Sequence, residues 1–113
     1  MANPGTNLNI NLSAIVYCES GVWLAHCLEL DIVAEGEGAN DAFESLKSLC
    51  DLQITVALEE GDIGSVFRPA PPEIWKLFAA GTDRATEFKA GRGKSRGFKA
   101  PVNRFESRQV CFA

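Results

Sequence analysis

The chain has 113 residues, of which 46% are hydrophobic and 23% charged, as in an ordinary globular domain, so a multi-domain enzyme with a large cofactor fold is excluded. No run of about 18 apolar residues predicts a membrane span, and no secretory signal is recognisable, so we expect a cytoplasmic protein with no membrane contact. The net charge of −4 divides into −10 over residues 1–75 and +6 over residues 76–113. This division indicates an interaction protein whose parts meet partners of opposite sign, or a basic segment that folds back onto an acidic body.

The first third of the chain predicts three short strands. Residues 8–17 alternate apolar and polar side chains, residues 22–28 are rich in β-forming side chains, and residues 32–35 form a shorter run. The sequence Glu19-Ser20-Gly21 predicts a turn between the first two strands. Three adjacent strands of this length predict an antiparallel meander.

A long helix is predicted next, with a cap at residues 40–41. Its apolar side chains recur at three- and four-residue spacing and share one stripe: Phe43, Leu46, Leu49 and Cys50. Residues 52–58 also alternate as in a strand. We favour one helix that continues to about Glu60 and stops at Gly61, over a helix that ends near Asp51 and is followed by a strand.

Shorter elements and a tail are predicted after this helix. Residues 65–68 suggest an edge strand, and Pro72 suits the first turn of a helix that ends at Gly81. The remaining sequence is rich in glycine and basic residues, which predicts flexibility, although its last residues regain the hydrophobic character of a strand that could dock. The predicted divisions are an α+β domain at 1–68, a proline-led short helix at 69–81 and a basic, flexible tail at 82–113.

The two faces of the predicted meander carry different side chains. If the first hairpin pivots near Ser20, Tyr17 opposes Trp23 on the face away from the long helix. One helix cannot cover both faces of a sheet. We therefore expect either that the second helix covers this face or that Tyr17, Trp23 and Ile15 form an exposed apolar patch for a partner. A cross-strand pair that only stabilises the hairpin is the alternative for the two aromatic residues.

Candidate catalytic and metal-binding residues are few. His26 is the only histidine, and its neighbour Cys27 points to the opposite face of the strand, so a hydrogen-bonded histidine is favoured over a catalytic pair. The four cysteines form no CxxC pair, so we expect free thiols, no metal and no cofactor. Glu29, Asp31 and Glu35 suggest either a metal site for a nuclease or, as we favour, a solvated acidic rim.

A basic run in a glycine-rich context lies near the end of the chain. Its members are Arg92, Lys94, Arg96 and Lys99, with Phe98 interleaved. Such a run can follow a phosphate backbone without reading its sequence, or it can simply keep the chain in solution.

Four short motifs lie in order with suitable gaps in the first half of the chain. They are Cys27-Leu28-Glu29-Leu30, Gly36-Glu37-Gly38, Asn40-Asp41-Ala42 and Leu46-Lys47. With the segment that contains them, over about residues 10–60, the chain resembles the HicB-like antitoxin family. It departs from the family where Glu37-Gly38 replaces a usual Asp-Thr, where Leu30-Asp31 replaces a Pro-Gly turn, and beyond residue 81, where no DNA-binding module is recognisable.

The resemblance implies an α+β fold with a three- to four-stranded antiparallel sheet and one long helix on one face, in a partial RNase H-like order β-β-β-α-β. A short C-terminal helix and the basic tail follow. The resemblance also implies a protein that is not an enzyme. Such a protein binds and masks a small basic HicA-type toxin, a ribonuclease whose positive charge is attracted by the acidic part of this chain. The expected contact residues are Tyr17, Trp23, Glu29, Asp31, Glu35 and Glu37.

Self-association and two rival functions complete the expectations. A chain this short has a modest core, so we expect a homodimer or a higher oligomer. One rival function is a stand-alone protein of the same fold that binds nucleic acid through the basic tail. The other is a small metal-dependent nuclease.

Overall fold

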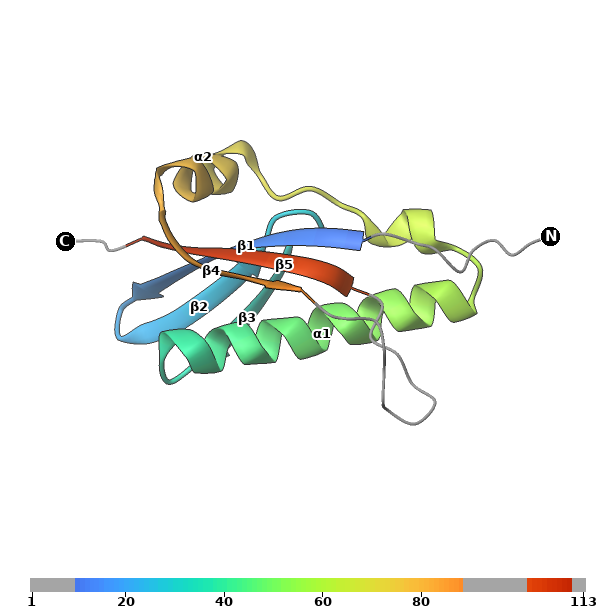
Figure 1. The fold of residues 1–113 in the computed structure, drawn as a ribbon, viewed down its shortest axis with the longest axis horizontal. Helices are drawn as coiled ribbons and strands as arrows, with labels where there is room; N and C mark the ends of the chain where they lie inside the picture. The colour runs from blue at the N-terminus through green and yellow to red at the C-terminus, as the bar shows by residue number, and fades with distance from the viewer. Residues whose placement is uncertain (1–9, 89–101, 111–113) are drawn as a thin grey trace.

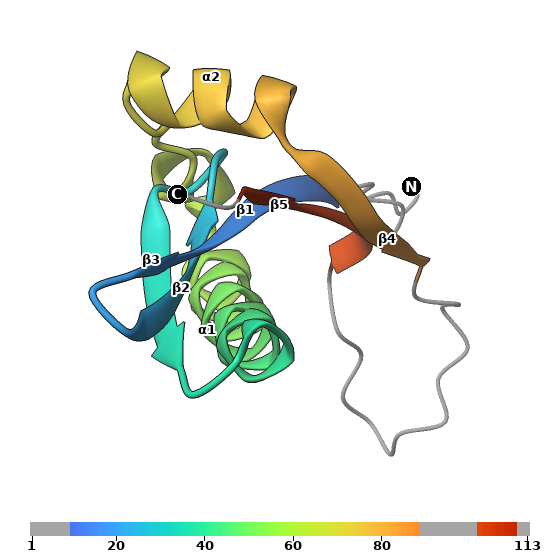
Figure 2. The same ribbon diagram turned by 90° about the vertical axis from the view of Figure 1, so that its left-hand side faces the viewer.

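The computed structural model describes residues 10–88 and 102–110, which form one sheet with helices on both of its faces (Figures 1 and 2). In chain order the elements are β1 (Ile10–Glu19), β2 (Val22–Cys27), β3 (Ile32–Gly36), α1 (Ala39–Glu59), the 3-10 turn η2 (Ile63–Val66), α2 (Pro72–Ala80), β4 (Thr82–Phe88) and β5 (Val102–Val110). The predicted meander, the single long helix and the proline-led helix are confirmed. The predicted edge strand at 65–68 is wrong, because those residues lie in and after η2.

The sheet has five strands in the order β3-β2-β1-β5-β4, and β5 runs parallel to its neighbour β1 while all other pairs are antiparallel. The α+β class is therefore confirmed, but the prediction of a purely antiparallel sheet of three or four strands is wrong. The prediction of a tail from residue 82 is also wrong for β4, whereas β5 confirms the alternative that the last residues dock as a strand. Residues 89–101 lie outside the described part of the chain.

A bulge in β5 explains why its pattern is difficult to read from sequence. Ile10 pairs with Val102 and Asn11 pairs with Arg104, so Asn103 is an extra residue between the two pairs. Its Oδ1 atom accepts a hydrogen bond from the Ile10 backbone N–H at 2.9 Å. As a result Val102 and Phe105, which are three residues apart, are both buried, and the strict alternation of a strand is broken.

The first hairpin has a register one residue away from the predicted one. Ser20 and Gly21 have φ values of 54° and 81°, and this two-residue turn with left-handed backbone matches the twist of the flanking strands. Tyr17 therefore opposes Leu24, and Trp23 opposes Cys18. Because a shift of one residue moves every side chain to the other face, Trp23 packs against the α1 side of the sheet and the predicted Tyr17–Trp23 pair is wrong.

The main core lies between α1 and the sheet. The buried stripe of the helix consists of Ala42, Phe43, Leu46, Cys50, Ile54 and Ala57. Phe43 meets Phe105 of β5 edge to face, with ring centroids 5.2 Å apart. Leu49 was expected in this stripe, but its side chain is 38% exposed. Gly61 takes the left-handed conformation (φ 73°) that the predicted helix stop requires.

The beginning of α1 differs from the predicted cap. The capping residue is Gly38, which has no side chain to cap the helix. Asp41, in the first turn, instead accepts a hydrogen bond at 2.9 Å from the backbone N–H of Glu37. The hydrogen bond at this helix end therefore joins the Asp41 side chain, inside the helix, to the backbone of Glu37, the residue before the capping residue.

The second helix covers part of the opposite face of the sheet (Figure 2). Ile15 is fully buried there, which confirms that the short helix removes it from the expected patch. Gly81, directly after α2, lies so close to β1 and β5 that an added Cβ would be 3.2 Å from Ile15 Cδ1. In the described part of the chain, no helix is long and apolar enough to cross a membrane.

Candidate partner-binding surface

The six residues expected to bind a partner do not form one surface. Glu35 on β3 and Glu37 after it are exposed; Glu35 opposes Leu24 on the sheet face away from α1, whereas the backbone N–H of Glu37 donates to Asp41 in the first turn of α1. Glu29 and Asp31 lie in the turn at the other end of β3. Tyr17 is half-buried on the sheet face away from α1, whereas Trp23 packs on the α1 side. Only Glu35 and Glu37 are therefore both exposed and adjacent.

Glu29 faces the protein and not the solvent. Its Oε1 atom accepts a hydrogen bond from the backbone N–H of Ser13 at 2.7 Å and lies 3.8 Å from the Cys27 thiol. Burial raises the pKa of Glu29 above its ordinary value, and the hydrogen bond from Ser13 opposes this shift in part. The side chain holds the β2–β3 turn against β1, so we assign it a role in the fold.

Asp31 is engaged in the same turn. Its Oδ1 atom lies 2.6 Å from Nε2 of His26, whose side chain is only 9% exposed. The backbone of Asp31 is left-handed, with φ of 55°, a conformation that aspartate tolerates better than most residues. The expectation of a hydrogen-bonded His26 is confirmed, and its partner is a carboxylate that the sequence places five residues further on.

Exposed carboxylates lie in the part of the chain where β3 leads into α1. We call Glu35, Glu37, Asp41 and Glu44 the acidic corner; all four residues are exposed, and Glu35 lies on the sheet face away from α1. Asp41 accepts the N–H of Glu37, and Glu44 forms an ion pair with Lys47 at 3.0 Å on the same helix. Surface pairs of this kind stabilise little and remain accessible to a competing cation. The acidic corner is thus a site where negative charge is presented to solvent.

Converging metal ligands are absent from the described residues. No group of three or more histidine, cysteine, aspartate or glutamate side chains is placed there to hold an ion. Glu29, Asp31 and Glu35, the three carboxylates of the nuclease hypothesis, point to Ser13, to His26 and to solvent respectively.

The three described cysteines carry free thiols. They are Cys18, which is half-buried, and the fully buried Cys27 and Cys50. A hydrogen bond with Cys27 and burial both raise the pKa of Cys50. Both side chains are fully inaccessible and pack as small apolar groups in the core.

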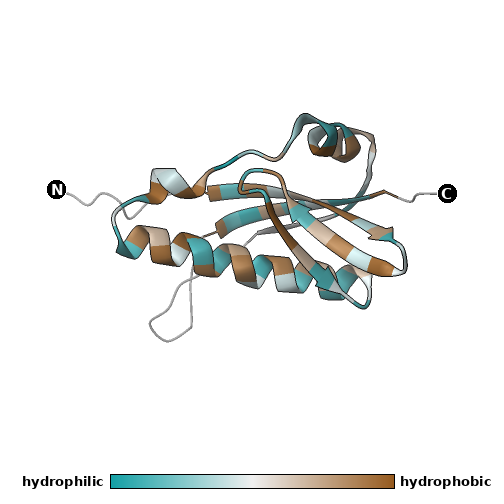
Figure 3. Cartoon of the chain, turned by 180° about the vertical axis from the view of Figure 1, so that it is seen from behind, coloured by the Kyte–Doolittle hydropathy of each residue, from teal (hydrophilic) through white to brown (hydrophobic). Residues whose placement is uncertain are grey.

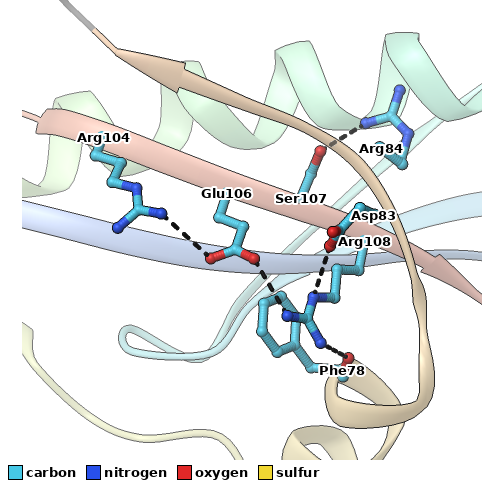
Figure 4. A network of polar contacts seen from close by, with 7 residues as sticks. All are labelled: Phe78, Asp83, Arg84, Arg104, Glu106, Ser107 and Arg108. Carbon is cyan, nitrogen blue, oxygen red and sulfur yellow. Dashed lines mark hydrogen bonds and ion pairs between the residues drawn. The ribbon is translucent and has the colours of Figure 1, made fainter.

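Figure 4 shows a network of polar contacts on β5, centred on Arg108, that was not expected from the sequence. The Arg108 guanidinium donates from Nη1 to the Phe78 carbonyl at 3.0 Å, lies 4.4 Å from the centroid of the Phe78 ring, and contacts Glu106 at 3.3 Å. Its Nε atom lies 3.1 Å from Asp83 but without hydrogen-bond alignment. Arg108 thus fixes the end of α2 to the sheet. The alternation Arg104, Glu106, Arg108 is the signal that could have identified it.

A second arginine joins β4 to α1 on the other face. Arg84 donates from Nη1 to Ser107 Oγ at 3.0 Å and from Nη2 to Asn40 Oδ1, and its guanidinium lies 5.4 Å from the centroid of the Phe43 ring. Arg84 also lines an open hollow of about 350 Å³ together with Thr82, Asp83 and Gln109. These contacts place a cation at the first turn of α1, next to the acidic corner.

Partly exposed apolar side chains remain on the sheet face that α2 leaves uncovered. Val22 and Val33 are 39% and 46% exposed, and Tyr17 and Leu24 are half-buried beside them. Burial, followed by the nearby charge of Glu19, raises the pKa of Tyr17, so its hydroxyl stays protonated. The expected apolar patch therefore exists in a different composition, without Trp23 and Ile15.

The basic residues Arg92, Lys94, Arg96 and Lys99 lie outside the described residues. Comparison with known proteins adds no assignment, since no family model, no curated protein and no solved structure matches the chain.

Proposed function

We propose that the chain is a HicB-like antitoxin, which binds a small basic HicA-type ribonuclease and masks it without catalysing a reaction. The ordered motifs between residues 27 and 47 support this proposal, as does the β-β-β-α order of the elements that contain them. The proposal places the protein in the cytoplasm, where its RNA-cleaving partner acts.

The acidic corner is the observation that carries the proposal. An RNA-binding surface is positively charged, and a carboxylate cluster attracts such a surface before contact and fixes its orientation afterwards. Glu35 lies on the sheet face away from α1, Glu37 follows β3, and Asp41 and Glu44 lie on the first turns of α1. Residues 1–75 carry a net charge of −10, so the long-range field has the same sign as the local contacts.

The expected contact set is revised accordingly. Glu35 and Glu37 remain as proposed contacts, and Asp41 and Glu44 are added to them. Glu29 and Asp31 are assigned to the turn because their carboxylates already contact Ser13 and His26.

Affinity purification of the chain from its native host, followed by mass spectrometry, tests the proposal. Wild-type protein should retain a small basic protein that cleaves RNA when it is released and not while it is bound. The double variant Glu35→Lys/Glu37→Lys should lose most of this partner. The matched control is Glu59→Lys/Glu60→Lys, which makes the same charge change at the exposed far end of α1 and should retain it.

Two outcomes would contradict the proposal. One is wild-type protein that retains no basic protein. The other is wild-type protein that retains only nucleic acid, released by moderate salt, which would favour binding through the basic run instead.

A further inference from the structure

β3 is an edge strand of the sheet, and its outer side has no neighbouring strand among the described residues. It pairs only with β2, over five residues and without a bulge. In Figure 2 β3 is the outermost strand on the side opposite β4, and Figure 3 views the molecule from behind, with this edge of the sheet towards the reader. A strand in this position presents backbone N–H and C=O groups that another extended chain can bind.

The hairpin register shows which backbone groups of β2 face which neighbour. The two-residue turn at residues 20–21 makes Glu19 and Val22 a hydrogen-bonded pair, and such pairs alternate along an antiparallel hairpin. The same alternation reaches the far end, where the Leu28 N–H donates to the Ser13 carbonyl at 2.9 Å. The backbone of β2 therefore bonds to β1 at even-numbered positions and to β3 at odd-numbered positions.

Val33 and Glu35 carry the outward-facing backbone groups of β3. Ala34 opposes Ala25, an odd-numbered position of β2, so the backbone groups of Ala34 are used inside the sheet. The N–H and C=O groups of Val33 and Glu35 alternate with these and point away from β2. Within the described residues, none of these four groups forms a backbone hydrogen bond.

The side chains along this edge determine which kind of chain fits it. Asp31, Val33, Glu35 and Glu37 are all exposed, and the Val33 side chain is 46% exposed. Three of these four are carboxylates, and residues 29–38 contain no lysine or arginine to balance them and no proline to block pairing. An added strand with an apolar side chain beside Val33 and a basic side chain beside Glu35 would complement both.

We propose that β3 binds an extended segment of the basic partner, which adds a sixth strand to the sheet. The inference rests on the proposed function for the identity of the partner and adds the mode of binding. The backbone of the segment bonds to Val33 and Glu35, and its basic side chains lie beside Glu35 and Glu37. Antiparallel pairing with a second copy of β3 would place carboxylates of both chains opposite one another, and a nucleic acid would meet charge of its own sign.

Hydrogen exchange of the isotope-labelled full chain tests the binding mode with a defined probe. The probe is a synthetic peptide of alternating lysine and valine. It should slow exchange of the Val33 and Glu35 amides about tenfold. The Ala34 amide is the internal control, because it is bonded to β2 and should exchange slowly with or without peptide. A peptide with glutamate in place of lysine should have no effect. Unchanged exchange at Val33 and Glu35 with the lysine peptide overturns the proposal.

A proline variant tests the same edge with the partner itself. Val33→Pro removes an outward N–H and no hydrogen bond within the sheet, and proline is tolerated at such edge positions. In the affinity purification, Val33→Pro should retain about a tenth of the partner that the wild type retains. The matched control is Val33→Thr, which keeps the donor and the branched side chain and should retain as much as the wild type. Circular dichroism shows whether both variants are folded; if the proline variant is not, the exchange experiment on the wild type decides.

The outcomes separate this inference from the proposed function. Equal retention of the partner by folded Val33→Pro and the wild type overturns the inference and leaves the proposed function standing. A wild type that retains no basic protein contradicts the proposed function, whereas the peptide experiment still decides what β3 binds. A homodimer that is lost in Val33→Pro would assign the edge to a second copy and overturn the proposal.

Discussion

Gly36 lies where β3 meets the first turn of α1, and it offers a sharp test of how the two elements are joined. A Cβ atom at this position would lie 2.3 Å from the Ala42 backbone nitrogen, 2.7 Å from the Ala42 Cα and 2.8 Å from the Asp41 carbonyl carbon. All three are backbone atoms and cannot rotate away. Alanine at this position therefore requires the strand and the helix to move apart.

The expected cost of Gly36→Ala is about 3 kcal/mol, the upper part of the range for overpacking, because three backbone contacts must be relieved at once. A loss of this size lowers the melting temperature of a domain of this length by roughly 12 to 20 °C. Urea unfolding followed by the fluorescence of Trp23 and Trp75 measures the free energy of unfolding directly.

Gly38→Ala is the matched control, two residues further along the chain. No heavy atom outside its immediate neighbours lies within 4 Å of a Cβ built there, and its backbone is extended, with φ of −154°. Its free energy of unfolding should stay within about 1 kcal/mol of the wild type. Equal losses in the two variants, or a Gly36→Ala protein as stable as the wild type, would refute the packing argument.

Three further predictions concern other contacts. Arg108→Met should lower the free energy of unfolding in urea by about 2 kcal/mol, because the Phe78 carbonyl loses a charged hydrogen-bond donor. Asp83→Ala should cost less than about 1 kcal/mol in the same assay, because the Asp83 side chain is 79% exposed. Gly61→Ala should cost about 1 kcal/mol in the same assay, since a Cβ is disfavoured at φ of 73°; an unchanged midpoint would contradict this. Burial raises the pKa of Glu29 in the folded state, so the folded chain binds the proton of this carboxyl group more tightly than the unfolded chain does. The protein therefore loses stability as the pH rises from 4.5 through the folded pKa. Glu29→Gln should therefore gain stability relative to wild type over that rise, and a difference that is constant with pH would contradict the assignment.

The local elements could be predicted from the sequence because their signals are local. Alternation over residues 8–17 indicates a strand whatever it pairs with, and Gly61 ends a helix because of its own backbone freedom. The α+β class follows from the order of these elements. The acidic character of the first 75 residues is likewise a property of composition alone.

The arrangement of the strands was decided by tertiary structure. The glycine- and base-rich residues 91–100 indicated a tail, and the hydrophobic character of the last residues indicated only that they could dock as a strand. The tertiary structure decided where β5 docks: beside β1, parallel to it, and with a bulge at Asn103. Its stability comes from pairing with β1 and β4 and from Phe105 against Phe43, contacts between residues far apart in the chain.

The faces of the candidate surface also depended on long-range geometry. A two-residue turn at Ser20 and Gly21, in place of a pivot at one residue, moved Trp23 to the α1 side of the sheet. The sequence by itself determined which side chains are charged, apolar or turn-forming. Only the tertiary structure decided that Glu29 and Asp31 are engaged in a turn while Glu35 and Glu37 are exposed, because strand register and close packing are set by partners that no local pattern specifies.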